Sequence, residues 1–339
     1  MKRWITLVLI ILSAASSWSA ETFRLTILHT NDLHGMMLPY DYTAPNPYSR
    51  KNAGGLARRY TEIQRIRKTS KDPVVLIDCG DLFTRGPWHT SFYGILEIEA
   101  LNLMGYDMMC IGNNEFKATE GVDSQQKMLT LMRRSRFPWL TANLTVGATG
   151  VPVEGIHPYI VRDIKGLRVG FLGLTAPRSK DYPQTVGWTI TDPIKAAAYW
   201  VPIARKECDV LIGVTHIADV LDEQLASQVA GIDAVVGGDS HTYIPRARMV
   251  KNPEGRMVPI VQAGEQGIML GFMQLTLEKT DGWHVVRTGS RLIPITSSIK
   301  EDAAMNTLLG RWLDIPSKAE APAKKPVNGN AVQAPVYRH

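Results

Sequence analysis

The chain has 339 residues, of which 45% are apolar and 21% are charged, with 28 glycines and 20 prolines. This is ordinary globular composition, and it excludes collagen-like, coiled-coil and wholly disordered chains. The net charge of +6 is not gathered into a basic and aromatic stripe, so it indicates no nucleic-acid partner and only favours anionic ligands.

Residues 1–20 have the pattern of a signal peptide. Two basic residues precede an almost wholly apolar run at 4–14, and small residues follow it. That run is shorter than the roughly 20 residues needed to cross a bilayer. We expect cleavage after Ala20, with Ser19 or Ala15 as alternatives, and a periplasmic or secreted protein without a stable membrane span. An uncleaved anchor is the alternative.

Strand-like and helix-like segments alternate from residue 23 onward, which predicts an α/β architecture. The strands are apolar, β-branched runs, and the helices have apolar residues at helical spacing or begin with a capping residue followed by proline. In chain order we expect a strand at 23–29, a helix at 55–68, a strand at 74–78, a helix at 91–104, strands at 107–111 and 167–174, a helix from 191–193, a strand at 210–214, a helix at 222–230 and a strand at 234–236.

The pattern changes after residue 241. A turn at 252–255 joins two apolar runs into a predicted hairpin, and strands at 269–277 and 284–287 follow. The segment 317–339, rich in alanine, proline and lysine, cannot bury a core and is predicted to be a disordered tail. We therefore predict one domain at 21–316, which includes a short helical extension at its end.

The chain has three cysteines, Cys79, Cys110 and Cys208. Their low and odd number does not fit a disulfide framework, so we expect three buried apolar side chains. A bridge between Cys79 and Cys110 is the alternative in an oxidising compartment.

Residues of types that can bind divalent cations directly follow five of the predicted strands. Because the carboxyl ends of strands in an open α/β sheet face one crevice, these residues should converge. A single such motif is common by chance, but five in order indicate a site for two metal ions. The motifs are Asn31-Asp32-Leu33-His34, Gly80-Asp81, Gly112-Asn113-Asn114-Glu115, Thr215-His216 and Gly237-Gly238-Asp239-Ser240-His241.

Eight stretches distributed over the chain carry a family resemblance. They are HTNDLHG (29–35), GGLAR (54–58), GDLF (80–83), GNNEF (112–116), RVGFLGLT (168–175), VTHIAD (214–219), GIDAVVGGDSHT (231–242) and QAGEQG (262–267). With them the chain resembles the 5′-nucleotidase branch of the calcineurin-like metallophosphoesterases. The resemblance implies a single-domain, four-layer αββα sandwich with a dinuclear site at the strand ends. It implies one cation on Asp32, His34, Asp81 and His241, and a second on Asp81, Asn113, His216 and Asp239.

The chain departs from the family pattern at three positions. Asn114 replaces a histidine that acts on the leaving group, and it can donate a hydrogen bond but cannot transfer a proton, a contribution of roughly 10²–10⁴-fold. Lys117 replaces the acid that orients that histidine; it either faces the phosphate or is a solvated residue. Asp239 replaces a histidine ligand, and its charge favours manganese or magnesium over zinc. His89 is either a substitute acid or a structural loop residue.

The resemblance implies an exported dinuclear phosphoesterase that hydrolyses nucleotides or other small phosphoesters. Water activated by the two cations, with manganese favoured, would attack phosphorus while Asn113 and Asn114 contact phosphoryl oxygens. Because the family's base-binding domain would need more chain than follows residue 300, we expect none. The alternative is a non-catalytic envelope protein that binds metal or a phosphorylated ligand.

Overall fold

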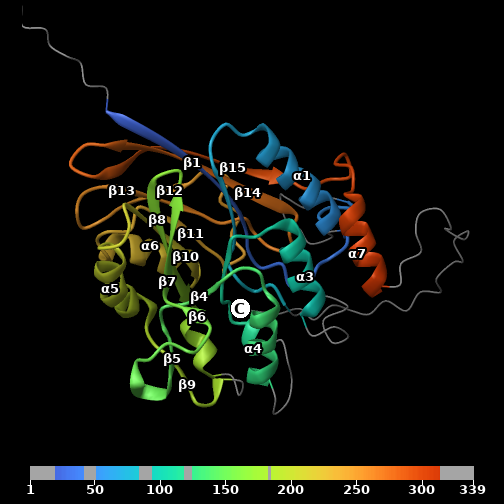
Figure 1. Ribbon diagram of the computed structural model, residues 1–339, viewed down its shortest axis with the longest axis horizontal. Coiled ribbons are helices and arrows are strands. Elements are labelled where there is room, and N and C mark those ends of the chain that lie inside the picture. Colours follow the sequence, from blue (N-terminus) through green and yellow to red (C-terminus); the bar gives the residue numbers. More distant parts are fainter. Residues whose placement is uncertain (1–19, 42–50, 84–93, 118–123, 182–184, 314–339) are drawn as a thin grey trace, which may run out of the picture.

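The computed structural model describes residues 20–41, 51–83, 94–117, 124–181 and 185–313. Two β-sheets lie face to face, and helices cover the outer face of each (Figure 1). The predicted disordered tail and, apart from Ala20, the predicted signal peptide lie outside the described residues.

The first sheet has seven strands in the order β15-β14-β1-β2-β3-β4-β6. Strands β1 to β6 of this sheet run parallel to one another, and β14 is antiparallel to both β1 and β15. The strands are β1 (Glu21–Thr30), β2 (Val74–Asp78), β3 (Met108–Cys110), β4 (Trp139–Leu140), β6 (Ile156–His157), β14 (Met269–Lys279) and β15 (Trp283–Pro294).

The second sheet has six strands in the order β12-β13-β11-β10-β8-β7. Its four central strands are parallel, and the edge strands β7 and β12 are antiparallel to their neighbours. The strands are β7 (Tyr159–Ile164), β8 (Leu167–Thr175), β10 (Val210–His216), β11 (Ala234–Val236), β12 (Arg248–Lys251) and β13 (Met257–Val261). A separate two-stranded ribbon joins β5 (Leu144–Val146) to β9 (Trp188–Ile190).

Helices α1 (Leu56–Thr69), α3 (Ile95–Met104), α4 (Ser124–Arg134) and α7 (Ala303–Leu313) lie on one side of the sandwich, and α5 (Pro193–Ala204) and α6 (Asp219–Gln228) lie on the other (Figure 1). Short 3-10 turns form η1 (Glu115–Lys117), η2 (Gly147–Thr149) and η3 (Pro177–Asp181). None of the helices among the described residues is long and apolar enough to cross a membrane.

Three apolar cores separate the four layers, because successive side chains of a strand point to opposite faces of its sheet. In β1, Ile27 packs between the sheets with Phe171 of the second sheet, whereas Leu28 packs outward against Leu56 of α1. On the outer face of the second sheet, Leu211 packs with residues of α5 and α6. The arrangement confirms the expected αββα sandwich.

Most predicted elements are present, but several bounds were wrong and some elements were missed. The helix predicted at 222–230 is α6, Asp219–Gln228, and the strand predicted at 284–287 is the long β15, which pairs with β14 along its length. The sequence analysis did not identify α4 or the strands β4, β5, β6, β7 and β9. The helix start at 191–193 is confirmed, because the Asp192 side chain accepts a hydrogen bond from the backbone N–H of Lys195.

All three cysteines are buried and free, as expected. The alternative of a Cys79–Cys110 bridge is wrong: the Cys79 thiol donates to the carbonyl of Val236, and the Cys110 thiol donates to that of Leu174. Burial raises the pKa of the Cys110 thiol to about 12, so it is neutral at physiological pH.

Candidate metal centre

The five predicted motifs lie at the carboxyl ends of β1, β2 and β3 in one sheet and of β10 and β11 in the other. Backbone bonds hold the ends of β1 and β2 in register: the Asp32 N–H donates to the carbonyl of Gly80 and the His34 N–H to that of Asp81, each at 2.9 Å. The Asp239 N–H crosses from the second sheet to the Asp32 carboxylate at 2.9 Å. The site therefore lies where the ends of both sheets meet.

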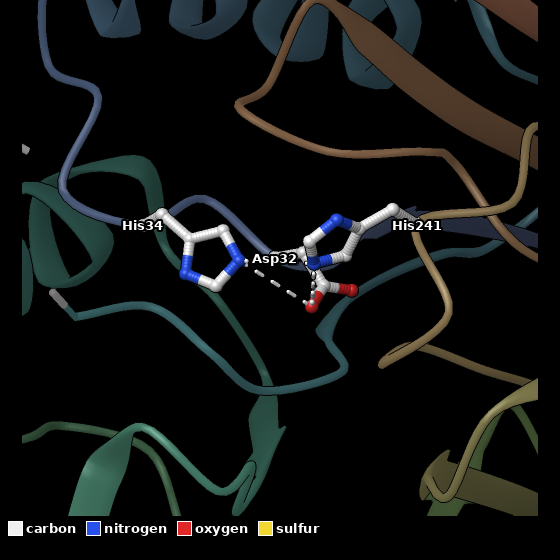
Figure 2. A group of neighbouring side chains, drawn as sticks. All are labelled: Asp32, His34 and His241. Carbon is white, nitrogen blue, oxygen red and sulfur yellow. Dashed lines mark hydrogen bonds and ion pairs between the residues drawn. The ribbon is translucent and has the colours of Figure 1, made fainter. Parts of the chain in front are cut away.

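A first cluster consists of Asp32, His34 and His241, with both imidazole rings beside one carboxylate (Figure 2). Asp32 Oδ1 is 3.2 Å from His241 Nε2 and 3.8 Å from His34 Nε2, and the two nitrogens are 3.1 Å apart. Asp32 and His34 are fully buried, whereas the His241 side chain is 25% exposed. One cation could contact all three ligand atoms, which lie within 4.8 Å of one another.

A second cluster consists of Asp32, Asp81 and His216, all buried, so Asp32 belongs to both clusters. Within the described parts of the chain, the near neighbours of His216 Nε2 and Asp32 Oδ1 are other ligand atoms of the site: Asp81 Oδ1 lies 3.2 Å from His216 Nε2, and His241 Nε2 lies 3.2 Å from Asp32 Oδ1. Carboxylate oxygens and imidazole nitrogens are ligands that a divalent cation takes, so these residues fit the metal that the family pattern implies.

In two of the three histidines, the ring nitrogen that faces away from the clusters has a partner of its own. His216 Nδ1 lies 2.7 Å from the carbonyl of Cys79, and His241 Nδ1 lies 3.0 Å from the Glu265 carboxylate. Such contacts fix the tautomer and orientation of a metal-binding histidine. Glu265 was quoted within a family stretch but was not predicted as a site residue.

The carboxylates of the clusters strongly change the acidity of the histidines beside them. Burial disfavours charge on His241, but Asp32 and Glu265 outweigh it and raise the pKa of His241 to about 10. The pKa of His216 is likewise raised, against the effect of burial, by Asp81 and Asp32. Protons thus compete for the nitrogens that a cation would need, and a bound cation would take their place.

The backbone at the site adopts a conformation that is rare outside glycine. Five of the predicted ligands have a positive φ, a state that costs of order 1–3 kcal/mol per residue and recurs at functional sites. The φ values are 52° at Asp32, 52° at His34, 56° at Asp81, 85° at Asp239 and 56° at His241. The fold therefore holds these side chains in place at a cost in stability.

Two glycines allow the loops after β2 and β3 to approach each other. A Cβ at Gly80 would overlap the backbone of Gly112, and a Cβ at Gly112 would overlap Asp81. Glu115 ties the same loops together, because its carboxylate accepts from the backbone N–H groups of Asp81, Leu82 and Gly112 at 2.6–2.9 Å.

Two further predicted ligands, Asn113 and Asp239, share a partner that the sequence analysis did not identify. Arg178 of η3 donates to both oxygens of Asp239 and, at 2.7 Å, to Asn113 Oδ1. His216 Nε2 lies 3.4 Å from Asp239 Oδ1. Burial opposes ionisation of Asp239, but His216 and Arg178 together hold its pKa below the ordinary value.

Asn114, predicted to be catalytic, lies against Asp81. Its backbone N–H donates to Asp81 Oδ1 at 2.7 Å, and its side-chain amide donates to Asp81 Oδ2. Lys117 ends η1 and is partly buried, and its backbone N–H donates to the carbonyl of Asn114. His89 lies outside the described residues.

Fold and site together define a class: an αββα sandwich with histidine and carboxylate ligands for divalent cations at the ends of both sheets. The chain belongs to the calcineurin-like phosphoesterase family, whose sequence profile matches residues 25–243. This confirms the family predicted from the motifs.

Individual relatives agree with this assignment. The chain is 31% identical to the 5′-nucleotidase of Rattus norvegicus over 319 residues, which are 87% of this chain and 53% of that protein. A solved 5′-nucleotidase precursor from Thermus thermophilus matches with a TM-score of 0.75 and 25% identity, over 86% of this chain and 59% of its own. The calcineurin-like phosphoesterase YfkN from Bacillus subtilis matches with a TM-score of 0.68 and 23% identity, over 87% of this chain and 98% of its own, and supports the fold. The chain thus spans about half the length of the curated relatives it matches.

Proposed function

We propose that this protein is an exported, divalent-metal-dependent phosphoesterase that hydrolyses nucleotides or other small phosphoesters, with two cation positions that share Asp32. The observation that carries the proposal is the pair of buried clusters, Asp32 with His34 and His241, and Asp32 with Asp81 and His216. A protein that served only as a scaffold would have no use for carboxylates and imidazoles whose ligand atoms lie within 4.8 Å of one another.

A divalent cation held at these clusters would polarise a phosphoryl oxygen and lower the pKa of a coordinated water. The chain's own residues supply the rest of the chemistry. Glu265 and the Cys79 carbonyl orient His241 and His216, and Asp81 is held by Asn114. The Asn114 amide has a second N–H, which we assign to a phosphoryl oxygen of the substrate.

The metal preference follows from the donor set. Asp239 adds a carboxylate where the family pattern has an imidazole, and oxygen ligands favour Mn²⁺ or Mg²⁺, whereas imidazole favours Zn²⁺. We propose Mn²⁺ as the preferred ion. The substrate class rests on similarity, because the relatives described above include 5′-nucleotidases, and the matches cover 53% and 59% of those proteins.

A second candidate function is binding without turnover. Asn114 favours it, because its amide cannot protonate a leaving group and already donates to Asp81. In that case the cations would serve to hold a phosphorylated ligand in the envelope.

The first test is hydrolysis of 5′-AMP and of bis-p-nitrophenyl phosphate by the purified protein with Mn²⁺. Asp81→Asn serves as the blank, and Asn114→His as the variant that restores a group able to transfer protons. We expect wild-type turnover that is lost in Asp81→Asn. We also expect a gain in Asn114→His that is larger for 5′-AMP, whose alkoxide leaving group needs a proton more than nitrophenolate does.

Two results would contradict this proposal in different ways. Bound metal without wild-type turnover, together with turnover gained in Asn114→His, would favour the binding function. The absence of both bound metal and turnover would exclude the metal-dependent enzyme. Export is tested separately, by cell fractionation and by mass spectrometry of the mature chain. The mass should show cleavage after Ala20, or after Ser19 or Ala15.

A further inference from the structure

Two ligands predicted for the second cation, Asn113 and Asp239, contact a cationic side chain of the protein itself. Arg178 Nη2 donates to Asp239 Oδ1 and to Asn113 Oδ1, and Nη1 donates to Asp239 Oδ2 at 2.7 Å. Asn113 follows β3 in the first sheet, Asp239 follows β11 in the second, and Arg178 follows β8. The guanidinium therefore bridges both sheets.

Arg178 contacts two of the four ligands that the family resemblance implies for a second cation, Asn113 and Asp239. Asp239 Oδ1 lies 3.4 Å from His216 Nε2, so the oxygen bound by the guanidinium also faces a ligand atom of the second cluster. A cation and a guanidinium that share these oxygens repel each other, because both are positive. The ligand atoms of Asp32, Asp81 and His216 lie within 4.8 Å of one another, as those of the first cluster do, so what the guanidinium takes from the second position is its two other predicted ligands, Asn113 and Asp239.

The residue at position 239 makes this arrangement chemically consistent. A carboxylate presents two oxygens to the planar fork of an arginine, whereas an imidazole presents one nitrogen and cannot accept from both arms. Asp239 and Arg178 are therefore matched in shape and charge, and a histidine at position 239 could not make the same contact with Arg178.

The position of Arg178 also suits an anionic substrate. Its side chain is 53% exposed, while Asp239 and Asn113 are buried. The guanidinium therefore caps the buried ligands from the solvent side. The positive charge of an arginine so placed favours the binding of a phosphoryl group beside it.

We propose that Arg178 supplies a second positive charge in this site: the chain holds one divalent cation tightly at Asp32, His34 and His241, while the guanidinium on Asn113 and Asp239 weakens the second cation position and binds the phosphoryl group. This inference rests on the proposed function, since it assigns the partner of the phosphoryl group in the same site.

The test measures bound metal and phosphate rather than turnover. Mn²⁺ is titrated calorimetrically into wild type, Arg178→Ala, Asp239→His and the control Arg168→Ala, and bound metal is counted after dialysis. Arg168 is a matched control, because its side chain is 51% exposed, it pairs with Asp209 through two N–H donors, and it lies at the opposite end of β8. We expect one tightly bound Mn²⁺ in wild type and in Arg168→Ala, and a second, at least about tenfold tighter than in wild type, in Arg178→Ala and Asp239→His.

Inorganic phosphate provides the second measurement. With one Mn²⁺ per chain, Arg178→Ala should bind phosphate about tenfold or more weakly than wild type, because it loses a charge-assisted contact. Excess Mn²⁺ should restore phosphate binding in this variant by filling the position that the guanidinium no longer weakens. Circular dichroism and thermal melting establish that each variant is folded. We expect Arg178→Ala to fold, because the side chain of Arg178 is largely exposed.

The outcomes separate the two proposals. Two tightly bound cations in wild type, or one cation in wild type and still one in both site variants, would overturn the role of Arg178 and leave the metal-dependent phosphoesterase standing. No cation in wild type or any variant would overturn the proposed function itself. A purely structural role for the ion pair would lower the melting temperature of Arg178→Ala without changing the metal count, and this would also overturn the inference.

Discussion

Burial changes the acidity of single side chains in this protein, and Glu97 of α3 is an example. Glu97 is 2% exposed, and within the described chain its Oε2 has no hydrogen-bond partner. Burial disfavours the charged form and raises its pKa from 4.5 to about 7. Between these values the unfolded chain releases a proton that the folded chain retains, so folding becomes less favourable as pH rises.

We therefore expect the protonated form of Glu97 to support stability fully below pH 4.5 and to lose that support as pH rises through 7. The loss amounts to about 3 kcal/mol at most. In Glu97→Gln the side chain stays neutral, so the unfolding free energy of the variant relative to wild type should rise between pH 5 and pH 8. Urea unfolding at both pH values measures the difference, with the exposed Glu154→Gln as control. An unchanged difference would contradict the prediction.

The candidate ligands that the structure brings together could be predicted from sequence one residue at a time, whereas the residues that contact them could not. Asp32, His34 and Asp81 directly follow strands, and the topology of a parallel sheet brings such positions together. Arg178 and Glu265 lie in segments that come close to Asp239 and His241 only in the folded chain. Nothing in the sequence around them states that Arg178 reaches Asp239 or that Glu265 reaches His241.

Among the elements, the turn η1 has a role beyond its length of three residues. Its first residue, Glu115, is buried and accepts three backbone N–H groups from the loops after β2 and β3. One of these N–H groups belongs to Asp81, which both cation positions were predicted to share. The element thus sets the position of a ligand through backbone contacts.

Glu115→Gln should weaken this connection. The amide nitrogen of glutamine is a donor, so at least one backbone N–H would face another donor and remain unsatisfied, at a cost of about 1–3 kcal/mol. We expect a lower melting temperature and weaker Mn²⁺ binding. Glu223→Gln is the matched control, because Glu223 is 45% exposed, accepts from Arg248 and should tolerate the change. Equal melting temperatures for the two variants would argue against the role of Glu115.

The secondary structure elements that the sequence revealed are those with long, uniform apolar runs. Strands such as β2 and β10 are buried along nearly their whole length, and this burial is visible as a continuous apolar segment. The missed strands are different. β4 and β6 have two residues each, and β7 is a partly exposed edge strand, so neither period nor composition distinguishes them from loops.

At the scale of the whole molecule, cation binding should raise the free energy of unfolding. A ligand that binds only the folded state stabilises it by mass action, by about 2.7 kcal/mol at a hundredfold excess over its dissociation constant. We expect Mn²⁺ to raise the melting temperature of wild type and chelation to lower it. Differential scanning calorimetry measures the shift, and Asp32→Asn should reduce it most, because Asp32 belongs to both clusters. An equal shift in that variant would place the stabilising cation elsewhere.

The position of the candidate ligands on both sheets has a consequence for the resistance of the protein to proteolysis. His34 and His241 stand 207 positions apart in the chain, and a cation bound between them would act as a cross-link that closes this long loop. The cysteines form no such bridge. The metal would thus do what disulfides do in many secreted proteins, and resistance to proteases would rise and fall with the supply of divalent ions in the surroundings.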